Sequence, residues 1–120
     1  MKSSPRLNSD MVAEVMTQGR AVKSASFLFK YVEISNTRPK NKTFFGFISS
    51  KKNFPTAVER SRARRRGRAA LQRALKGPAE LRKSIYGAFV LGKEAAAVDM
   101  NLFVEEIQQV LFKSGILVKQ

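Results

Sequence analysis

The sequence predicts one small α+β domain, in which a mixed sheet of about four strands packs with a central basic helix, an N-terminal helix and a C-terminal helix. Apolar residues at helical spacing occur near both ends, and aromatic or β-branched runs of strand length lie between them, interrupted by an Arg-rich segment. With 120 residues and 43% hydrophobic content, the chain can build one core. We expect one domain over 1–120, with flexible ends at 1–6 and 116–120.

The N-terminal half predicts one helix and three strands. Side-chain oxygens at 8–10 can cap a helix that Gly19 ends. Strands are predicted at 20–24, 26–34 and 43–50. The polar segment 35–42 is typical of an exposed connection between paired strands. Gly46, inside a predicted strand, indicates a bulge or a point where another backbone or a ligand comes close.

The C-terminal half predicts the basic helix, one strand and a last helix. Thr56 is a suitable N-cap for the basic helix, and residues 77–78 (Gly-Pro) end it. A nearly continuous apolar run predicts a strand at 84–92, and Asp99 caps a helix ending near Gly115. The apolar residues that share one face of this helix are Phe103, Ile107, Val110 and Leu111.

Positive charge is concentrated between residues 51 and 76. Seven arginines, three lysines and one glutamate give this span nine of the fourteen net positive charges. Such a concentration predicts a surface that binds a polyanion. No apolar run approaches the roughly 20 residues that span a bilayer, and the first residues lack an apolar signal segment. We therefore expect nucleic acid and no membrane as the partner, and a cytoplasmic location.

A helical wheel separates the small residues of the basic segment from its arginines. The small residues form a stripe that should face the sheet: Ala63, Gly67, Ala70 and Ala74. Leu71 and Leu75 should anchor the C-terminal half of the helix in the core. One group of arginines points away from the stripe (Arg62, Arg65, Arg66), and another forms an adjoining row (Arg60, Arg64, Arg68). The arginines of this row repel one another, and bound phosphates would relieve that repulsion.

The chain lacks the usual residues of a protein catalytic centre. It has no His and no Cys, which removes the common general base, the thiolate nucleophile and the usual zinc ligands. Glu105 and Glu106 should be solvated on the polar side of the last helix. We expect no catalytic residue, no metal site and no cofactor bound by the protein alone.

The run FISSKKNFPTAVERSRARRRGRAAL, at 47–71, resembles the signature of the bacterial ribonuclease P protein component family. That signature has a strand ending in Ser-Lys-Lys, an Ala-Val pair, and an Arg-Asn-Arg helix with further basic residues. The matching residues are Ser50, Lys51, Lys52, Ala57, Val58, Arg60, Ser61, Arg62, Arg64, Arg65 and Arg68. Ser61 replaces the Asn, and the turn at 53–55 has an extra residue.

The resemblance implies a protein subunit that binds a catalytic RNA and the 5′ leader of precursor tRNA, while the RNA and its Mg²⁺ ions perform the cleavage. The expected RNA-binding residues are Lys51, Lys52, Arg60, Ser61, Arg62, Arg64, Arg65, Arg66 and Arg68. The expected leader-groove residues are Val12, Met16, Lys30 and Ile48. Val12 and Met16 stand where the family usually has aromatic residues.

The alternative is a structural RNA-binding protein, for example a ribosomal protein of similar fold, with the same charge and no role in cleavage. In either case we expect no obligate protein partner. The phenylalanines of the strands, Phe27, Phe29, Phe44, Phe45 and Phe47, are expected in the core, because strand alternation buries one face.

Overall fold

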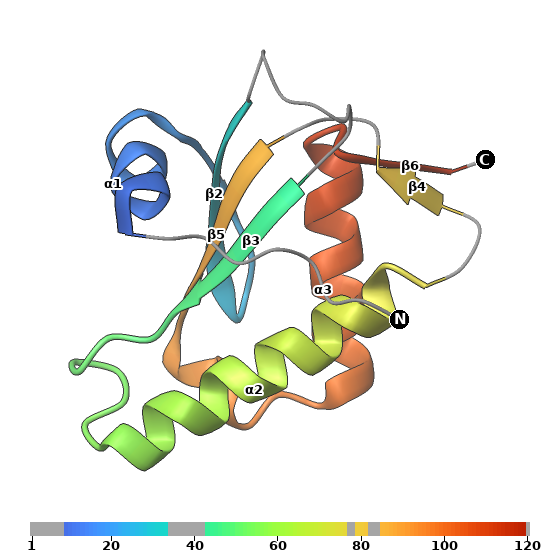
Figure 1. Cartoon of the computed structure of the whole chain (residues 1–120). Coiled ribbons are helices and arrows are strands. Elements are labelled where there is room, and N and C mark those ends of the chain that lie inside the picture. The colour runs from blue at the N-terminus through green and yellow to red at the C-terminus, as the bar shows by residue number, and fades with distance from the viewer. Residues whose placement is uncertain (1–8, 34–42, 77–78, 82–84, 120) are drawn as a thin grey trace.

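The computed structural model describes residues 9–33, 43–76, 79–81 and 85–119. The elements follow in the order α1 (Ser9–Gln18), β1 (Arg20–Lys23), β2 (Phe27–Glu33), β3 (Thr43–Ile48), α2 (Ala57–Ala74), β4 (Ala79–Leu81), β5 (Ile85–Leu91), a 3-10 turn η1 (Lys93–Ala96), α3 (Met100–Lys113) and β6 (Leu117–Lys119). Every helix and strand expected from the sequence is present, and the α+β class is confirmed (Figure 1).

The main sheet has four strands in the order β1-β2-β5-β3. β2 is antiparallel to both β1 and β5, whereas β3 is parallel to β5. The segment 35–42, which lies outside the described residues, therefore does not join paired strands as expected, because β5 lies between β2 and β3. A parallel pair needs a long crossover connection, and α2 is part of the one between β3 and β5.

The pairing of β3 with β5 is regular along its length. Phe44 is opposite Tyr86, Gly46 opposite Ala88, and the register continues to Ile48 without an inserted residue. The bulge expected at Gly46 is therefore absent from this ladder.

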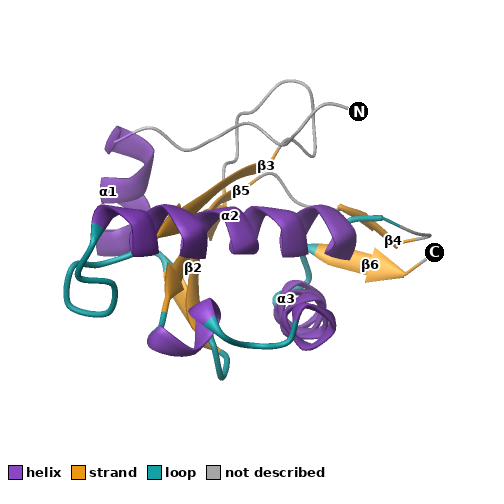
Figure 2. Cartoon of the chain, turned by 90° about the horizontal axis from the view of Figure 1, so that it is seen from below, coloured by secondary structure: helices purple, strands orange, loops and turns teal. Residues whose placement is uncertain are grey.

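The inner face of the sheet is a cluster of aromatic rings around Phe89 of β5. Its ring centroid lies 4.6 Å from that of Phe29, 4.9 Å from Phe47, 5.3 Å from Phe27 and 5.9 Å from Phe45. These four rings are buried, as expected, whereas Phe44, which was also expected in the core, is only half-buried on the other face of β3. The helix face of α3 predicted from the sequence is also buried, and α2 and α3 cover this side of the sheet (Figure 2).

The opposite, outer face of the sheet is only partly covered. α1 contacts β2 and β5 there and lies across the sheet from α3 (Figure 1). Val15 of α1 and Ala88 of β5 are fully buried. The outer-face side chains of β3, beyond α1, stay half-buried.

The C-terminal end forms a short strand, β6. β6 pairs with β4 in a small antiparallel sheet, and Ile116 and Leu117 are buried. Gly115, at φ 77°, turns the chain from α3 into this strand. The flexible ends expected at 1–6 and 116–120 stay a prediction, and 1–6 and 120 lie outside the described residues.

Glu106 is buried, which contradicts the expectation that it is solvated like Glu105. Its Oε1 accepts hydrogen bonds from Ser24 Oγ (2.7 Å) and from the Ser26 amide (2.9 Å), and its Oε2 accepts one from Ser26 Oγ (2.9 Å). Glu105 remains exposed. The Glu106 carboxylate therefore fixes the β1–β2 connection to α3 and can be buried because its oxygens are hydrogen-bonded.

Candidate nucleic-acid interface

The basic helix α2 begins with a complete capping box. Thr56 Oγ1 accepts a hydrogen bond from the Glu59 amide (3.1 Å), and Glu59 Oε1 accepts one from the Thr56 amide (3.2 Å). The capping box gives hydrogen-bond acceptors to two backbone amides at the helix start. One of these acceptors is Glu59, the one acidic side chain that α2 contains. The rest of the helix surface is free of negative side chains.

The small residues of α2 face the interior, as the helical wheel predicts. The buried residues of the helix are Ala63, Gly67, Ala70, Leu71 and Ala74. This stripe seats α2 on β3 and α3, and Leu75 packs partly buried against the same core. Since these side chains are short, the backbone of α2 lies close to the sheet and is held rigidly.

The arginines of α2 fall into three groups with different surroundings. Arg62, Arg65 and Arg73 are exposed, and within the described part of the chain their side chains have no hydrogen bond or ion pair. Lys51 and Lys52, in the turn before α2, are exposed in the same way. These cations are available to a partner without breaking any internal contact.

The second group is the row of Arg60, Arg64 and Arg68, which lies along the border between α2 and β3. Arg60 donates to the carbonyl oxygens of Phe54 (3.0 Å) and Pro55 (3.2 Å). The guanidinium of Arg68 lies 6.0 Å from the ring centroid of Phe47. This row is half-buried and preorganised, unlike the exposed group.

Two serine hydroxyls hold the middle member of that row. Arg64 donates from Nη1 to Ser49 Oγ (2.8 Å) and from Nη2 to Ser61 Oγ (3.4 Å). Ser49 in turn donates to the carbonyl oxygen of Arg60 (3.3 Å). Ser61, expected as an RNA-binding residue, thus has a role inside the protein, which is to orient Arg64.

Arg66 differs from the outward position that the helical wheel predicts. Its Nε donates to the carbonyl oxygen of Ala95 (3.0 Å), and its Nη2 donates to that of Val98. The wheel gives the direction of the side chain from α2, but not the position of the η1–α3 connection beside it. Arg66 therefore ties α2 to this connection instead of facing solvent.

The residues predicted for a leader groove lie on the outer face of the sheet and on α1. Lys30 and Ile48 are half-buried on the sheet, on the face opposite Phe29 and Phe47. Val12 of α1 is half-buried, and Met16 is 39% exposed. Lys30 Nζ donates to the carbonyl oxygen of Met16 (3.2 Å), so that α1 and β2 are joined at this point.

Sequence reasoning omitted Arg73 and an aromatic pair from the candidate site. Arg73 lies eleven residues after Arg62, which is about three helical turns, so the wheel could have placed both on one face. Phe44 and Tyr86, a half-buried pair on the outer face, become neighbours only through the pairing of β3 with β5. The sequence alone carries no signal for that pairing.

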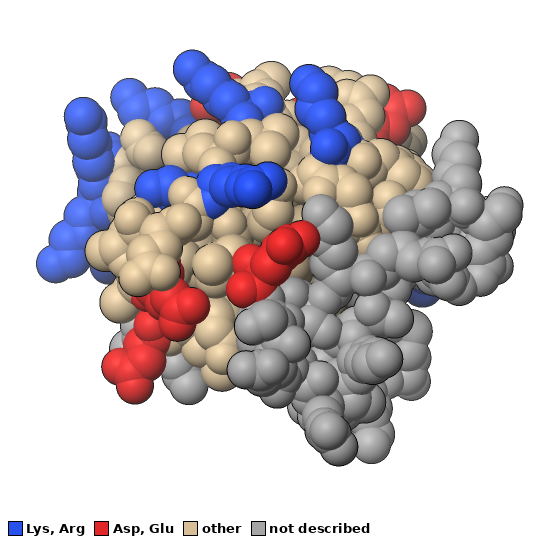
Figure 3. Space-filling model, turned by 90° about the horizontal axis from the view of Figure 1, so that it is seen from above, with Lys and Arg blue, Asp and Glu red and all other residues tan. Residues whose placement is uncertain are grey.

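Charge is distributed differently on the other side of the molecule. Figure 3 shows the molecule from the side opposite α2, and this face carries acidic and basic side chains together. Among the described residues, no group of three or more acidic side chains could hold a metal ion, and no helix is long and apolar enough to cross a membrane. By contrast, α2 and the turn before it carry many exposed cations and one acidic side chain, Glu59.

The domain is small and α+β, it holds an Arg-rich helix rigidly against its core, and its described residues include no acidic cluster. These features are typical of RNA-binding proteins that act through positive charge. The sequence profile of the family described as Ribonuclease P matches residues 1–115. The chain therefore belongs to the ribonuclease P protein family, the protein component of the RNA-catalysed endoribonuclease that matures the 5′ end of tRNA.

Solved structures agree with this assignment at the level of the fold. The ribonuclease P protein of Staphylococcus aureus is 17% identical, with a TM-score of 0.67 over 96% of this chain and 98% of that one. The ribonuclease P protein of Thermotoga maritima is 16% identical, with a TM-score of 0.67 over 93% of this chain and 97% of that one. No curated protein matches the chain. The alternative of a ribosomal-protein-like role is not supported.

Proposed function

We propose that the exposed cations of α2 contact the catalytic RNA, and that the outer face of the sheet beside α1 receives the 5′ leader of precursor tRNA. The observation that carries the first part is the group of Arg62, Arg65 and Arg73, whose side chains are exposed and have no partner within the described part of the chain. Guanidinium groups on a fixed helix can contact phosphates with little loss of side-chain or backbone freedom.

The anchored row of Arg60, Arg64 and Arg68 extends this contact toward β3. A guanidinium has five N–H donors, and Arg60 and Arg64 use only some of theirs in the hydrogen bonds described above, so that donors remain for phosphate oxygens. The row lies between the exposed arginines and the outer face of the sheet, and one RNA strand could contact both. Arg66 is not among the proposed contacts, because its guanidinium lies against the η1–α3 connection, where it donates to two carbonyl oxygens, and not along the border with β3.

In this scheme the protein contributes no catalytic group. The described residues offer neither a His or Cys nor a cluster of carboxylates, so the Mg²⁺ ions of the reaction would be held by the RNA. What the protein supplies is positive charge that offsets phosphate repulsion between catalytic RNA and substrate. Its effect should therefore be greatest when little Mg²⁺ is present.

Reconstitution tests this function. The purified chain is mixed with its cognate ribonuclease P RNA and a precursor tRNA at low Mg²⁺, and the rate of 5′ cleavage is measured. We expect acceleration relative to RNA alone, and a smaller gain as Mg²⁺ is raised. Absence of acceleration with the cognate RNA would contradict the proposal.

The leader site is tested separately by comparing precursor with mature tRNA. Met16→Glu places a negative charge on the exposed side of α1, beside the outer face. It should weaken binding of precursor tRNA to the reconstituted enzyme and leave binding of mature tRNA unchanged. Leu102→Glu is the matched control, because Leu102 is another exposed apolar residue on a helix, 51% exposed. Equal effects of the two variants would contradict a leader site beside α1.

A further inference from the structure

Ser49 joins the end of β3 to the middle arginine of the half-buried row. It directly follows the last residue of the strand, Ile48, which is still paired with Val90 of β5. Its hydroxyl donates a hydrogen bond to the carbonyl oxygen of Arg60 (3.3 Å) and accepts one from Nη1 of Arg64 (2.8 Å). Ser49 is therefore anchored by the sheet and contacts α2 at two points about one helical turn apart.

The carbonyl oxygen of the helix sets the direction of the Ser49 hydroxyl. The one proton of this hydroxyl is used in the bond to Arg60, so the lone pairs of its oxygen are left to accept from Arg64. Ser61 accepts from the other terminal nitrogen of the same guanidinium, Nη2, at 3.4 Å. Because one serine follows β3 and the other lies on α2, two separate elements fix the plane of the guanidinium.

Both groups that hold Arg64 are neutral. A carboxylate in their place would also fix the side chain, but it would offset the positive charge and compete with a phosphate for the same donors. The one acidic side chain of α2, Glu59, is instead engaged in the capping box with Thr56. Arg64 uses two of its five N–H donors within the described part of the chain, so it keeps its charge and its other donors for a phosphate oxygen.

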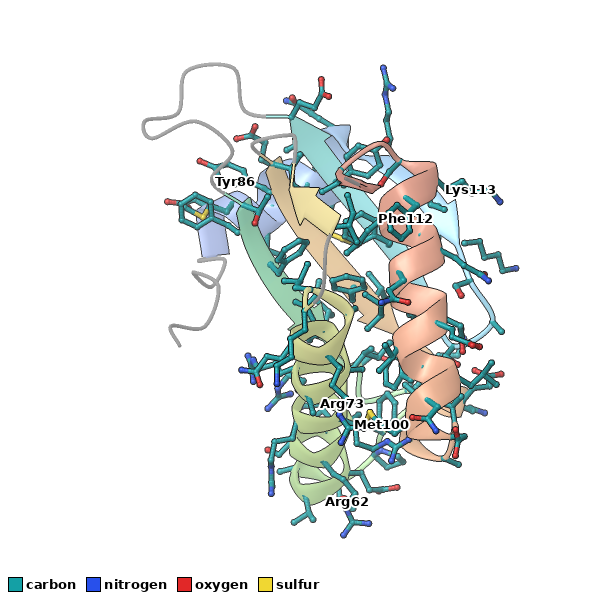
Figure 4. All side chains as sticks on the ribbon, turned by 90° about the vertical axis from the view of Figure 1, so that its right-hand side faces the viewer. Arg62, Arg73, Tyr86, Met100, Phe112 and Lys113 are labelled. Atoms are coloured by element: carbon teal, nitrogen blue, oxygen red, sulfur yellow. The ribbon has the colours of Figure 1, made fainter. Side chains whose placement is uncertain are left out.

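Arg62 shows a different way in which α2 presents a cation. Its side chain is exposed and points away from the sheet (Figure 4), and it has no hydrogen bond within the described part of the chain. A long exposed side chain samples many rotamers and loses that freedom when it binds a phosphate. Arg64 has already lost this freedom in the folded protein, so contact with RNA costs it less.

We propose that Ser49 is a positioning residue for RNA binding, whose hydroxyl holds Arg64 in the orientation that contacts a phosphate of the RNA. Ser49 touches no phosphate in this scheme and acts through Arg64 alone. The inference deepens the proposed function and rests on it, because it requires the border between α2 and β3 to face RNA. Loss of the hydroxyl should therefore lower affinity for RNA without removing any charge.

A double-mutant cycle on affinity for the cognate ribonuclease P RNA tests this inference. Ser49→Ala should weaken binding by about 2-fold to 10-fold, which is the range for immobilising one long side chain on binding. The same change made in Arg64→Ala should have no further effect, because the side chain that Ser49 positions is absent. Arg62→Ala is the matched background, in which Ser49→Ala should keep its full effect.

The salt dependence of binding separates positioning from charge. Ser49→Ala should leave the slope of log affinity against log salt unchanged, whereas Arg64→Ala should reduce it by about 0.7 to 0.9. Ser49→Thr keeps the hydroxyl and should bind like the unaltered chain, and Ser49→Val, of the same size without a hydroxyl, should bind like Ser49→Ala. Urea unfolding checks that each variant is folded, and if the larger side chains do not fit, the cycle with Ser49→Ala still decides.

The inference is overturned if Ser49→Ala binds RNA as tightly as the unaltered chain or more tightly, since the hydrogen bond would then not favour the binding orientation. It is also overturned if Ser49→Ala weakens binding equally with and without Arg64, which would indicate a general effect on the fold. Both results leave the proposed function intact, because acceleration of 5′ cleavage is measured independently. Conversely, absence of acceleration together with the expected cycle would contradict the proposed function and retain Ser49 as a positioning residue for RNA binding.

Discussion

Gly67 of α2 lies directly against the ring of Phe47 on β3. A Cβ atom at Gly67 would come within 2.6 Å of Cδ1 of that ring. Phe47 has little room to withdraw, because it is stacked on Phe89 with centroids 4.9 Å apart and planes at 12°. The close approach of the basic helix to the sheet therefore depends on the absence of a side chain at position 67.

Gly67→Ala should destabilise the protein, although Ala is the better helix former. Ala gains about 1 kcal/mol in intrinsic helix propensity, whereas overpacking a core commonly costs about 1–3 kcal/mol. We expect a net loss, seen as a lower midpoint of urea unfolding. Gln72→Ala, at an exposed position of the same helix, should change stability by less than about 0.5 kcal/mol. A raised midpoint for Gly67→Ala would contradict the close contact.

Removing the Glu106 side chain should destabilise the fold much more than removing its neighbour. Glu106→Ala leaves the Ser26 amide and two serine hydroxyls without their acceptor, which costs about 1–3 kcal/mol or more because the acceptor is a carboxylate. The free energy of unfolding in urea measures this. Glu106→Gln keeps one acceptor oxygen and should fall between the wild type and Glu106→Ala.

Glu105→Ala is the control for this pair, since the side chain is exposed one position away. It should change the free energy of unfolding by less than about 0.5 kcal/mol. Similar losses for the two alanine variants would mean that the hydrogen bonds of Glu106 contribute nothing specific.

The sequence predicts the helices and strands well, because caps and residue spacing, which determine them, are local features of the chain. Thr56 and Asp99 cap their helices as expected, and the small-residue stripe of α2 is buried as its spacing predicts. What was missed depends on contacts between distant parts of the chain. Glu106 bonds to Ser26, 80 positions away. Arg66 bonds to Val98, 32 positions away.

The same distinction applies to the candidate site. The sequence locates the positive charge on one helix, and the exposure of Arg62 and Arg65 agrees with the wheel. It does not say which arginines the protein itself uses, because this is decided by carbonyl and hydroxyl groups on other elements. Nor does it locate the pair of Phe44 and Tyr86, because strand order cannot be read from periodicity.

Arg66→Met should reduce stability while leaving RNA binding almost unchanged. Methionine keeps an apolar stem of similar length but removes the donors to the carbonyl oxygens of Ala95 and Val98. Hydrogen bonds with a charged donor contribute about 1.5–3 kcal/mol each. We expect the free energy of unfolding to fall by about 1–3 kcal/mol, because water partly hydrates the two carbonyl oxygens that lose their donor. Urea unfolding measures stability, and the salt dependence of RNA affinity measures whether the side chain contacts RNA phosphates.

Arg65→Met is the matched variant for this comparison, because Arg65 is exposed on the same helix. It should leave the unfolding midpoint nearly unchanged and reduce the salt dependence of RNA binding. The opposite result, with stability kept and RNA affinity lost in Arg66→Met, would show that Arg66 faces RNA as the wheel predicts.

Arg62→Ala combined with Arg65→Ala should weaken binding to the catalytic RNA and leave thermal stability nearly unchanged, because both side chains are exposed. If each guanidinium contacts one phosphate, losing two contacts reduces the slope of log affinity against log salt by about 1.5. Affinity is measured over a series of salt concentrations, and the unfolding temperature by circular dichroism.

The matched control removes the same charge elsewhere, with Arg20→Ala and Lys23→Ala on β1. Both residues are exposed, and β1 is the edge strand opposite β3 in the sheet. If α2 is the contact surface, the β1 pair should change the slope much less, since its charges act on the RNA only through a screened field. Equal changes for the two pairs would mean that net charge, rather than the position of the arginines on α2, determines RNA binding. A collapse of the unfolding temperature in the α2 pair would instead place these side chains inside the fold.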